Sequence, residues 1–137
     1  MSSLPPSSSP SDATATAPRH ILAIDDEVPI LELLKEYLSA QGFRVSTAST
    51  AIEARRVVES DPPDLIISDL QLEETDGLHL IEQLRALLPT KPVILLTGVL
   101  FEPQVVEETL KWKISSYVSK TAPLQVLVQE IRRLLPG

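Results

Sequence analysis

The sequence predicts an α/β fold in which a five-stranded parallel sheet carries helices on both faces. Short apolar runs alternate five times with segments of helical periodicity, and the connections between them are short. The runs at 20–24, 64–68 and 93–96 have uninterrupted apolar centres, which is typical of parallel strands buried on both faces. At 137 residues, one domain with a substantial core is expected.

In the first half of the chain, turn-forming residues separate the elements. The strand at 20–24 leads to a helix with Pro29 in its first turn, where a missing N–H costs nothing, and with Gly42 as its C-terminal stop. The alternating segment 43–48 is predicted to be a short strand at the sheet edge. A helix at 52–59 follows and stops before a pair of prolines.

The second half repeats this alternation. A central strand is expected at 64–68, followed by a helix whose leucines and isoleucine recur at helical spacing over 78–88, and then by a strand at 93–96. The remaining elements are expected to be a weaker helix at 105–112, a strand at 114–119 and a helix with one apolar face at 124–135.

Composition narrows the class of protein. The formal net charge of −7 disfavours direct nucleic-acid binding, because an acidic chain repels phosphate backbones. There is no cysteine, no apolar segment long enough to span a membrane, and no basic and apolar leader, so a cytoplasmic location is expected. Residues 1–18, rich in Ser, Pro, Thr and Ala, are predicted to be a disordered tail, and 19–137 the folded domain.

Acidic side chains follow two of the predicted strands. Asp25, Asp26 and Glu27 come directly after the first strand, and Asp69 comes directly after the third. The carboxyl ends of parallel strands meet at one edge of the sheet, where open α/β folds bind their ligands. Clustered carboxylates repel one another unless a cation lies among them, and oxygen ligands suit Mg²⁺. The sequence therefore predicts a magnesium site at this edge.

Two further strand ends add groups suited to phosphoryl chemistry. Thr97 follows the fourth strand and Lys120 follows the fifth. A carboxylate can attack phosphorus to form an aspartyl phosphate, while a metal, an ammonium and a hydroxyl stabilise the charge on the phosphoryl oxygens. Gly98 leaves room for the phosphoryl group to approach.

On these residues the chain resembles the receiver domains of two-component response regulators, the CheY-like family, from about His20 to Leu135. The motifs that carry the resemblance are Ile24-Asp25-Asp26-Glu27, Pro63-Asp64-Leu65-Ile66-Ile67-Ser68-Asp69-Leu70, Asp76-Gly77, Leu95-Leu96-Thr97-Gly98 and Tyr117-Val118-Ser119-Lys120. Their order and spacing also match the family. The resemblance implies a doubly wound, flavodoxin-like sheet with strand order 2-1-3-4-5.

The resemblance also implies a role for each site residue. Asp69 would accept a phosphoryl group from the phosphohistidine of a sensor histidine kinase or a phosphotransfer protein. The Mg²⁺ ligands would be Asp26, Asp69, the backbone carbonyl of Gln71 and, through water, Asp25. Lys120 would pair with the phosphoryl group. Thr97 would move toward the phosphoryl group, and Tyr117 would follow by changing from an outward to an inward rotamer.

Such a protein would catalyse only its own phosphorylation and slow autodephosphorylation, and would not be a metabolic enzyme. The switch would act on the face made by the fourth helix, fifth strand and fifth helix, which would bind a downstream protein. The surface around Val106, Leu110, Trp112 and Tyr117 is predicted to change most. Only Pro136 and Gly137 follow the last helix, so an output domain is not expected within this chain; whether it stands alone or dimerises is left open.

The sequence departs from the family pattern in four places. Glu73 replaces the usual proline after the phosphorylated aspartate, and Thr121 replaces the proline after the lysine, so a trans Lys120–Thr121 bond is expected. Lys113 and Ile114 replace a Gly-Ala pair, and Thr97 and Lys120 are about one residue further apart than is typical.

Two other functions are considered, of which the first stays open and the second is weaker. The altered loops at Glu73 and Thr121 motivate a receiver-like binding module that is not phosphorylated. A haloacid dehalogenase-type phosphatase would need Asp-x-Asp at its nucleophile, where this chain has Asp69-Leu70-Gln71. His20 and His79 have no metal-ligand spacing and are expected to be solvated.

Overall fold

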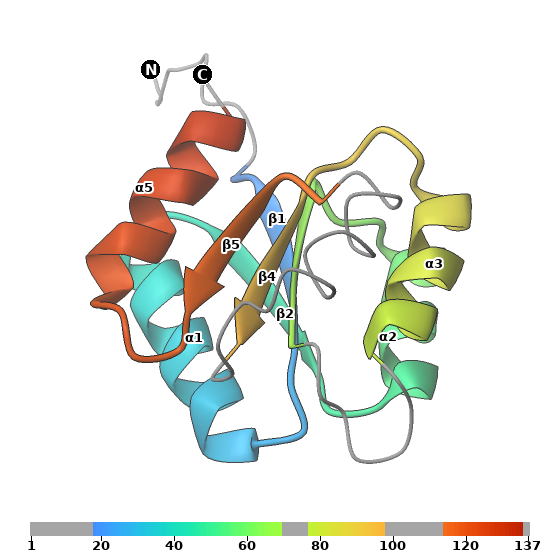
Figure 1. The fold of residues 1–137 in the computed structure, drawn as a ribbon, viewed down its shortest axis with the longest axis horizontal. Helices are drawn as coiled ribbons and strands as arrows, with labels where there is room; N and C mark the ends of the chain where they lie inside the picture. The colour runs from blue at the N-terminus through green and yellow to red at the C-terminus, as the bar shows by residue number, and fades with distance from the viewer. Residues whose placement is uncertain (1–17, 70–76, 98–113, 136–137) are drawn as a thin grey trace, which may run out of the picture.

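The structure is a computed structural model that describes residues 18–69, 77–97 and 114–135. Five parallel strands form one sheet in the order β2-β1-β3-β4-β5, which confirms the predicted fold class and strand order (Figure 1). The strands are β1 (His20–Ile24), β2 (Arg44–Ala48), β3 (Leu65–Ser68), β4 (Val93–Thr97) and β5 (Ser116–Ser119). The helices are α1 (Val28–Ala40), α2 (Ala51–Ser60), α3 (Gly77–Leu87) and α5 (Leu124–Leu134).

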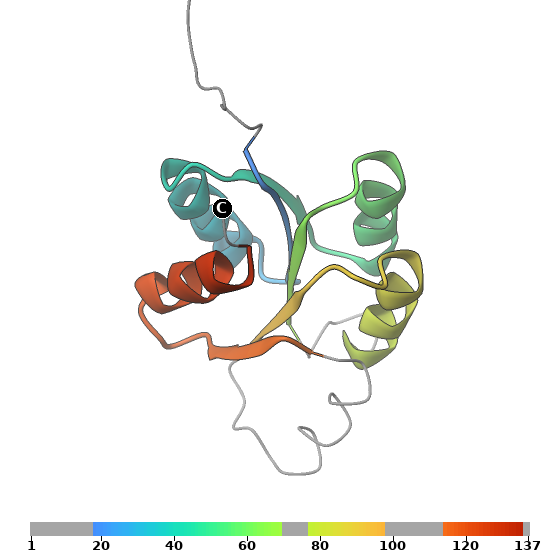
Figure 2. The same ribbon diagram turned by 90° about the horizontal axis from the view of Figure 1, so that it is seen from above.

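Helices cover both faces of the sheet. Figure 2 shows α1 and α5 on one side and α2 and α3 on the other. The pairing follows from the two-residue period of a strand: Ile21 and Ala23 of β1 face the α1 and α5 side, while Leu22 and Ile24 face the α2 and α3 side. All four residues are buried, which is why β1 reads as a continuous apolar run.

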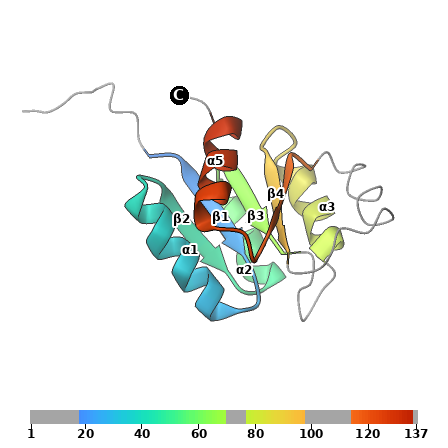
Figure 3. The same ribbon diagram turned by 60° about the vertical axis from the view of Figure 1, so that its left-hand side comes forward.

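The strands are aligned so that their carboxyl ends meet at one edge. β3 lies in the middle of the sheet and β2 at its edge, as predicted (Figure 3). In the register, Ile24 of β1 lies opposite Ala48 of β2 and Ser68 of β3. The residues that follow β1 and β3 therefore leave the sheet side by side. The predicted helix at 105–112 lies outside the described residues.

Local signals end and start the helices of the first half. Gly42 has a φ of 98°, a backbone conformation that favours glycine, and its N–H donates to Ser39 O at the end of α1. Pro29 lies in the first turn of α1, as predicted. α2 starts after Thr50, whose hydroxyl accepts a hydrogen bond from Glu53 N, and the Glu53 carboxylate in turn accepts one from Ser49 N.

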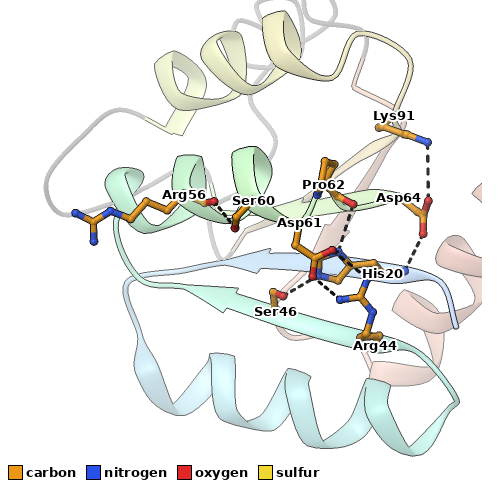
Figure 4. Close-up of polar contacts among 9 residues, drawn as sticks. All are labelled: His20, Arg44, Ser46, Arg56, Ser60, Asp61, Pro62, Asp64 and Lys91. Carbon is orange, nitrogen blue, oxygen red and sulfur yellow. Dashed lines mark hydrogen bonds and ion pairs between the residues drawn. The ribbon is translucent and has the colours of Figure 1, made fainter. Parts of the chain in front are cut away.

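The prediction that His20 is solvated is wrong. Its side chain is buried at the start of β1, where Nε2 lies 2.7 Å from Ser46 Oγ of β2 and Nδ1 lies 3.4 Å from Pro62 O (Figure 4). The His20 backbone N–H donates to Asp64 Oδ2 over 2.8 Å. His20 therefore ties β1 to β2 and to the loop that enters β3. His79 is exposed, as predicted.

Ion pairs surround this buried histidine at the amino ends of the strands. Arg44 donates to both carboxylate oxygens of Asp61, and Asp61 Oδ1 lies 3.7 Å from His20 Nδ1 (Figure 4). Lys91 Nζ lies 3.8 Å from Asp64 Oδ1. Ser60 Oγ donates to Arg56 O in the last turn of α2. Because these groups mostly bind one another, the cluster has a structural role: it joins β1 to β2 and to the loop before β3.

Across the described residues, no helix combines the length and the apolar character needed to cross a membrane.

Candidate functional site

The backbone brings the predicted acids together at the carboxyl edge of the sheet. Asp25 N donates to Ala48 O of β2 over 3.2 Å, and Asp69 N donates to Ile24 O of β1 over 3.1 Å. Each bond extends the strand pairing by one residue. Asp25 and Asp69 are thereby held beside each other at the centre of the sheet.

Four carboxylates form one cluster there. Asp25, Asp26, Glu27 and Asp69 each offer an oxygen within 4.8 Å of the others. Asp25 and Asp69 are buried, Asp26 is half-buried and Glu27 is exposed. The cluster therefore extends from the buried interior, at Asp25 and Asp69, to a solvent-exposed opening at Glu27, which we call its mouth. The structure brings together the acids that the sequence predicts at this edge.

Lys120 closes the cluster from the end of β5. Its Nζ lies 2.9 Å from Asp25 Oδ2, 2.8 Å from Glu27 Oε2 and 2.9 Å from Asp69 Oδ2. Its side chain is 15% exposed. Burial lowers the pKa of Lys120, but the three carboxylates outweigh burial and raise that pKa above the ordinary lysine value. Lys120 is therefore a permanent cation at neutral pH.

Asp25 is the most buried carboxylate of the cluster. Burial raises its pKa, and this effect outweighs the opposite effects of Lys120 and of the hydrogen bond from Glu27 N. Among the described residues, no donor makes a hydrogen bond of normal geometry to Asp25 Oδ2, and the Lys120 ammonium contacts it as an ion pair at 2.9 Å. A buried, under-compensated carboxylate oxygen in a cluster of oxygen donors suits a hard divalent cation. The residues present therefore fit Mg²⁺.

The loop after β5 carries Lys120 to the acids without the family proline. No peptide bond in the described residues is cis, so the Lys120–Thr121 bond is trans, as predicted. Thr121 N donates to Ser119 Oγ over 3.1 Å, and Ala122 N donates to Ser119 O over 3.0 Å. A cavity of about 70 Å³ lies beside this turn, lined by Lys120, Ile30, Leu33 and Pro123 among others. The Lys120 side chain thus passes from this turn along a mostly apolar cavity to the acids.

The remaining predicted residues are placed only in part. Thr97 ends β4, and the register sets its backbone opposite Ser119. Tyr117 lies in β5 and packs, partly buried, against the core on the α2 and α3 side. Gln71, Glu73 and Gly98 lie outside the described residues, as do Val106, Leu110 and Trp112.

A comparison with family models decides the identity. Residues 21–132 match the response regulator receiver domain. The chain belongs to this family. The matched residues take in all five strands except His20, together with the acids at the carboxyl edge, and the match confirms the resemblance to this family.

Individual relatives agree with this membership. The receiver domain is 35% identical over 114 residues to the transcriptional regulatory protein GlrR of Escherichia coli, a match that covers 83% of this chain but only 26% of GlrR. A CheY-like receiver domain protein from Methanospirillum hungatei superposes with a TM-score of 0.80 at 27% identity, covering 85% of this chain and 92% of that chain. TrrA of Thermotoga maritima, solved in complex with Mg²⁺-BeF, superposes with a TM-score of 0.74 at 30% identity, covering 85% and 98%.

One contact was not foreseen. Glu27 was grouped with the acids but given no role, whereas its carboxylate makes the shortest of the three contacts to Lys120. The three consecutive acids after β1 were a visible signal. What was missing was the direction of the Lys120 side chain, which no sequence pattern supplies.

Proposed function

We propose that this receiver domain is switched by phosphorylation of Asp69, with Mg²⁺, in a two-component signalling pathway. The observation that carries the proposal is the contact between Lys120 and Asp69 across 51 residues of sequence, inside a cluster of four carboxylates. Family membership supports a receiver function, and this geometry supports Asp69 as its chemical centre.

In the proposed transfer, a carboxylate oxygen of Asp69 attacks the phosphorus of a phosphohistidine. A bond forms between that oxygen and phosphorus while the P–N bond breaks, and the histidine nitrogen keeps the electron pair and takes a proton from water. Lys120 would leave the Asp69 oxygen that it now contacts and pair with a phosphoryl oxygen. Thr97, at the end of β4, would donate its hydroxyl to a second phosphoryl oxygen.

Asp26 and Asp69, with the Gln71 carbonyl, would hold the ion, and Asp25 would hold it through water. Bound Mg²⁺ supplies positive charge that offsets the phosphoryl oxygens. Asp25 is buried and lacks a normal hydrogen-bond donor at Oδ2, which supports its place beside a cation.

The partners follow from the same mechanism. The phosphodonor would be a sensor histidine kinase or a phosphotransfer protein, and a downstream protein would bind the face that includes β5 and α5. Tyr117 of β5 would follow Thr97 and alter that face. The activity is a single turnover on the protein's own carboxylate, followed by slow hydrolysis, which differs from turnover of a separate substrate.

The test is intact-mass analysis after incubation with phosphoramidate and Mg²⁺. A single labile phosphate adduct is expected on the wild type and none on Asp69→Asn, which keeps the shape of the side chain but lacks the nucleophile. Asp64→Asn is the matched control, because Asp64 flanks the same strand but lies before β3, at the opposite end from Asp69, where it binds the His20 backbone N–H. An unmodified wild type, or an adduct retained by Asp69→Asn, would favour a binding module that is not phosphorylated at Asp69.

A further inference from the structure

We propose that Glu27 restrains Lys120 at the mouth of the acidic cluster and that its charge selects against small dianionic phosphodonors. This inference rests on the proposed function and adds a positioning and specificity residue to it. The contact of Glu27 Oε2 with Lys120 Nζ, at 2.8 Å, joins residues that are 93 positions apart in sequence.

The ammonium of Lys120 has three N–H donors and faces three carboxylates at nearly equal distances. Asp25 and Asp69 hold it from the interior, with side chains only 2% and 6% exposed. Glu27 holds it from the solvent side, with a side chain that is 57% exposed. The exposed carboxylate of Glu27 therefore keeps the Lys120 ammonium at the edge of the cluster. Without it, the ammonium could move into solvent or pair with Asp69 alone.

Glu27 is itself fixed at its backbone. It is the N-terminal cap residue of α1, its N–H donates to Asp25 Oδ1 over 2.9 Å, and its carbonyl accepts from Ile30 N and Leu31 N. Its side chain makes no capping hydrogen bond, so it is available to Lys120. Lysine has a long flexible stem, and the turn after β5 lacks the family proline, so the position of the ammonium depends on its partners.

The charge of Glu27 has a second consequence at the mouth. Four carboxylates and one ammonium leave the cluster net negative, and Glu27 is the member most exposed to solvent. A unit charge roughly 6 Å from a dianion in water changes the encounter rate by up to about tenfold, and salt screens this effect. A phosphohistidine donor delivered by a docked protein is held in place by other contacts and is less sensitive.

The experiment compares two small donors that differ in charge, with the full chain in saturating Mg²⁺ near neutral pH. Acetyl phosphate is a dianion, phosphoramidate has a net charge near −1, and with either donor the Asp69 oxygen forms the new bond to phosphorus. The P–O bond of acetyl phosphate breaks with acetate leaving, and the P–N bond of phosphoramidate breaks with ammonia leaving. Glu27→Gln is expected to accelerate phosphorylation by acetyl phosphate about 3- to 10-fold at low salt, and by phosphoramidate about 2- to 3-fold, because the repulsion scales with donor charge.

Two controls test whether the change in phosphorylation rate comes from the charge at position 27. The first removes a charge elsewhere on the surface, and the second screens charges with salt. Glu36→Gln removes the same charge from an exposed position of α1, about 13 Å further along the helix, and should leave both rates unchanged. The gain in Glu27→Gln should disappear in about 0.5 M salt, where the Debye length falls to about 4 Å.

The restraint has its own readout in the side-chain NH₃⁺ signal of Lys120 by ¹H–¹⁵N NMR. An ammonium that donates hydrogen bonds to Glu27 and Asp69 and contacts Asp25 is expected to exchange slowly and give a signal, which Glu27→Gln should retain because an amide oxygen still accepts a hydrogen bond. Glu27→Ala should broaden or lose it. Equal rates for wild type and Glu27→Gln, or equal salt-independent gains with both donors, would overturn the charge selection. A sharp signal in Glu27→Ala would overturn the restraint.

The failure of this inference differs from the failure of the proposed function. A wild type that accepts phosphate from neither donor contradicts phosphorylation of Asp69. The Lys120 signal then still decides whether Glu27 holds the ammonium.

Discussion

Replacing Lys120 with methionine removes the cation of the cluster while keeping a straight side chain of similar length. The variant leaves two buried carboxylates, Asp25 and Asp69, without the ammonium that lies 2.9 Å from each. It also removes the partner of Glu27, which is exposed. Lys120→Met is therefore expected to be destabilised by like charges that no longer have a counter-charge.

The magnitude follows from the burial of each partner. An exposed ion pair such as that with Glu27 contributes about 0–1 kcal/mol. Removing one partner of a buried pair costs about 3–5 kcal/mol, because the other charge is left uncompensated. Since methionine avoids the burial cost of the ammonium, the lower end applies, and a loss of about 3 kcal/mol is expected. For a domain of this size that corresponds to a fall in Tm of roughly 12 °C.

The loss should depend on Mg²⁺ and on pH. Mg²⁺ at about 100 times its Kd for the variant stabilises the variant by about 2.7 kcal/mol. The wild type should gain less at the same concentration, because Lys120 already compensates the acids that would bind the ion, so Mg²⁺ should reduce the deficit. Burial raises the pKa of Asp25, and without Lys120 that pKa rises further. A carboxyl whose pKa is raised on folding contributes stability that is lost as pH rises through that pKa. The deficit should therefore be largest at neutral pH and shrink on acidification.

The assay is urea unfolding followed by circular dichroism at pH 7 and pH 5, with EDTA and with Mg²⁺. Lys91→Met is the matched control, because Lys91 is 41% exposed and lies 3.8 Å from a single carboxylate, so it should lose less than about 1 kcal/mol. A Lys120→Met deficit below about 1 kcal/mol, or one that neither Mg²⁺ nor acid reduces, would refute the view that this ammonium compensates the buried acids.

Three further substitutions test other parts of the structure. Asp25→Asn should raise Tm in EDTA at pH 7, because it removes a buried carboxylate whose pKa burial raises, and the gain should vanish as falling pH protonates Asp25 in the wild type; an unchanged gain at low pH would contradict this. His20→Ala should cost about 2–4 kcal/mol in urea unfolding, because it leaves a cavity at the start of β1 and an unpaired Ser46 hydroxyl. A loss below about 1 kcal/mol is typical of a surface residue and would contradict a structural role for the buried His20 side chain. Gly42→Ala should cost about 1 kcal/mol in the same assay, because φ is 98° there and an added Cβ would meet no atom within 4 Å. A loss above about 3 kcal/mol would mean that packing, and not backbone conformation, sets the requirement for glycine.

Much of the fold was predictable because its signals are local and agree with one another. The apolar centres of β1, β3 and β4 could only be buried strands at that length, and Pro29 and Gly42 delimit α1 by steric rules that act within a turn. The acids at the strand ends were predictable for a topological reason. Parallel strands deliver their carboxyl ends to one edge whatever else the chain does.

Two of the errors and omissions come from contacts between residues far apart in sequence, and a third comes from a strand boundary. His20 is a polar residue at a strand start, where sequence patterns predict exposure, but Ser46 and Pro62 supply partners that make its burial tolerable. Glu27 received no role because its partner, Lys120, is 93 positions away in the sequence. The start of β5 was placed at 114, whereas the strand begins at Ser116 and buried Ile114 precedes it. An apolar residue next to a strand reads like part of it.

The most direct test of a phosphorylation switch centred on Asp69 is a ¹H–¹⁵N amide spectrum with Mg²⁺, recorded before and after adding beryllofluoride, which mimics an aspartyl phosphate. Mg²⁺ alone should move the amides of Asp25, Asp26 and Asp69. Beryllofluoride should then move Asp69, Thr97 and Lys120 and extend the shifts along β5 to Tyr117. Shifts with Mg²⁺ and none with beryllofluoride would contradict the switch and leave a metal-binding interaction module.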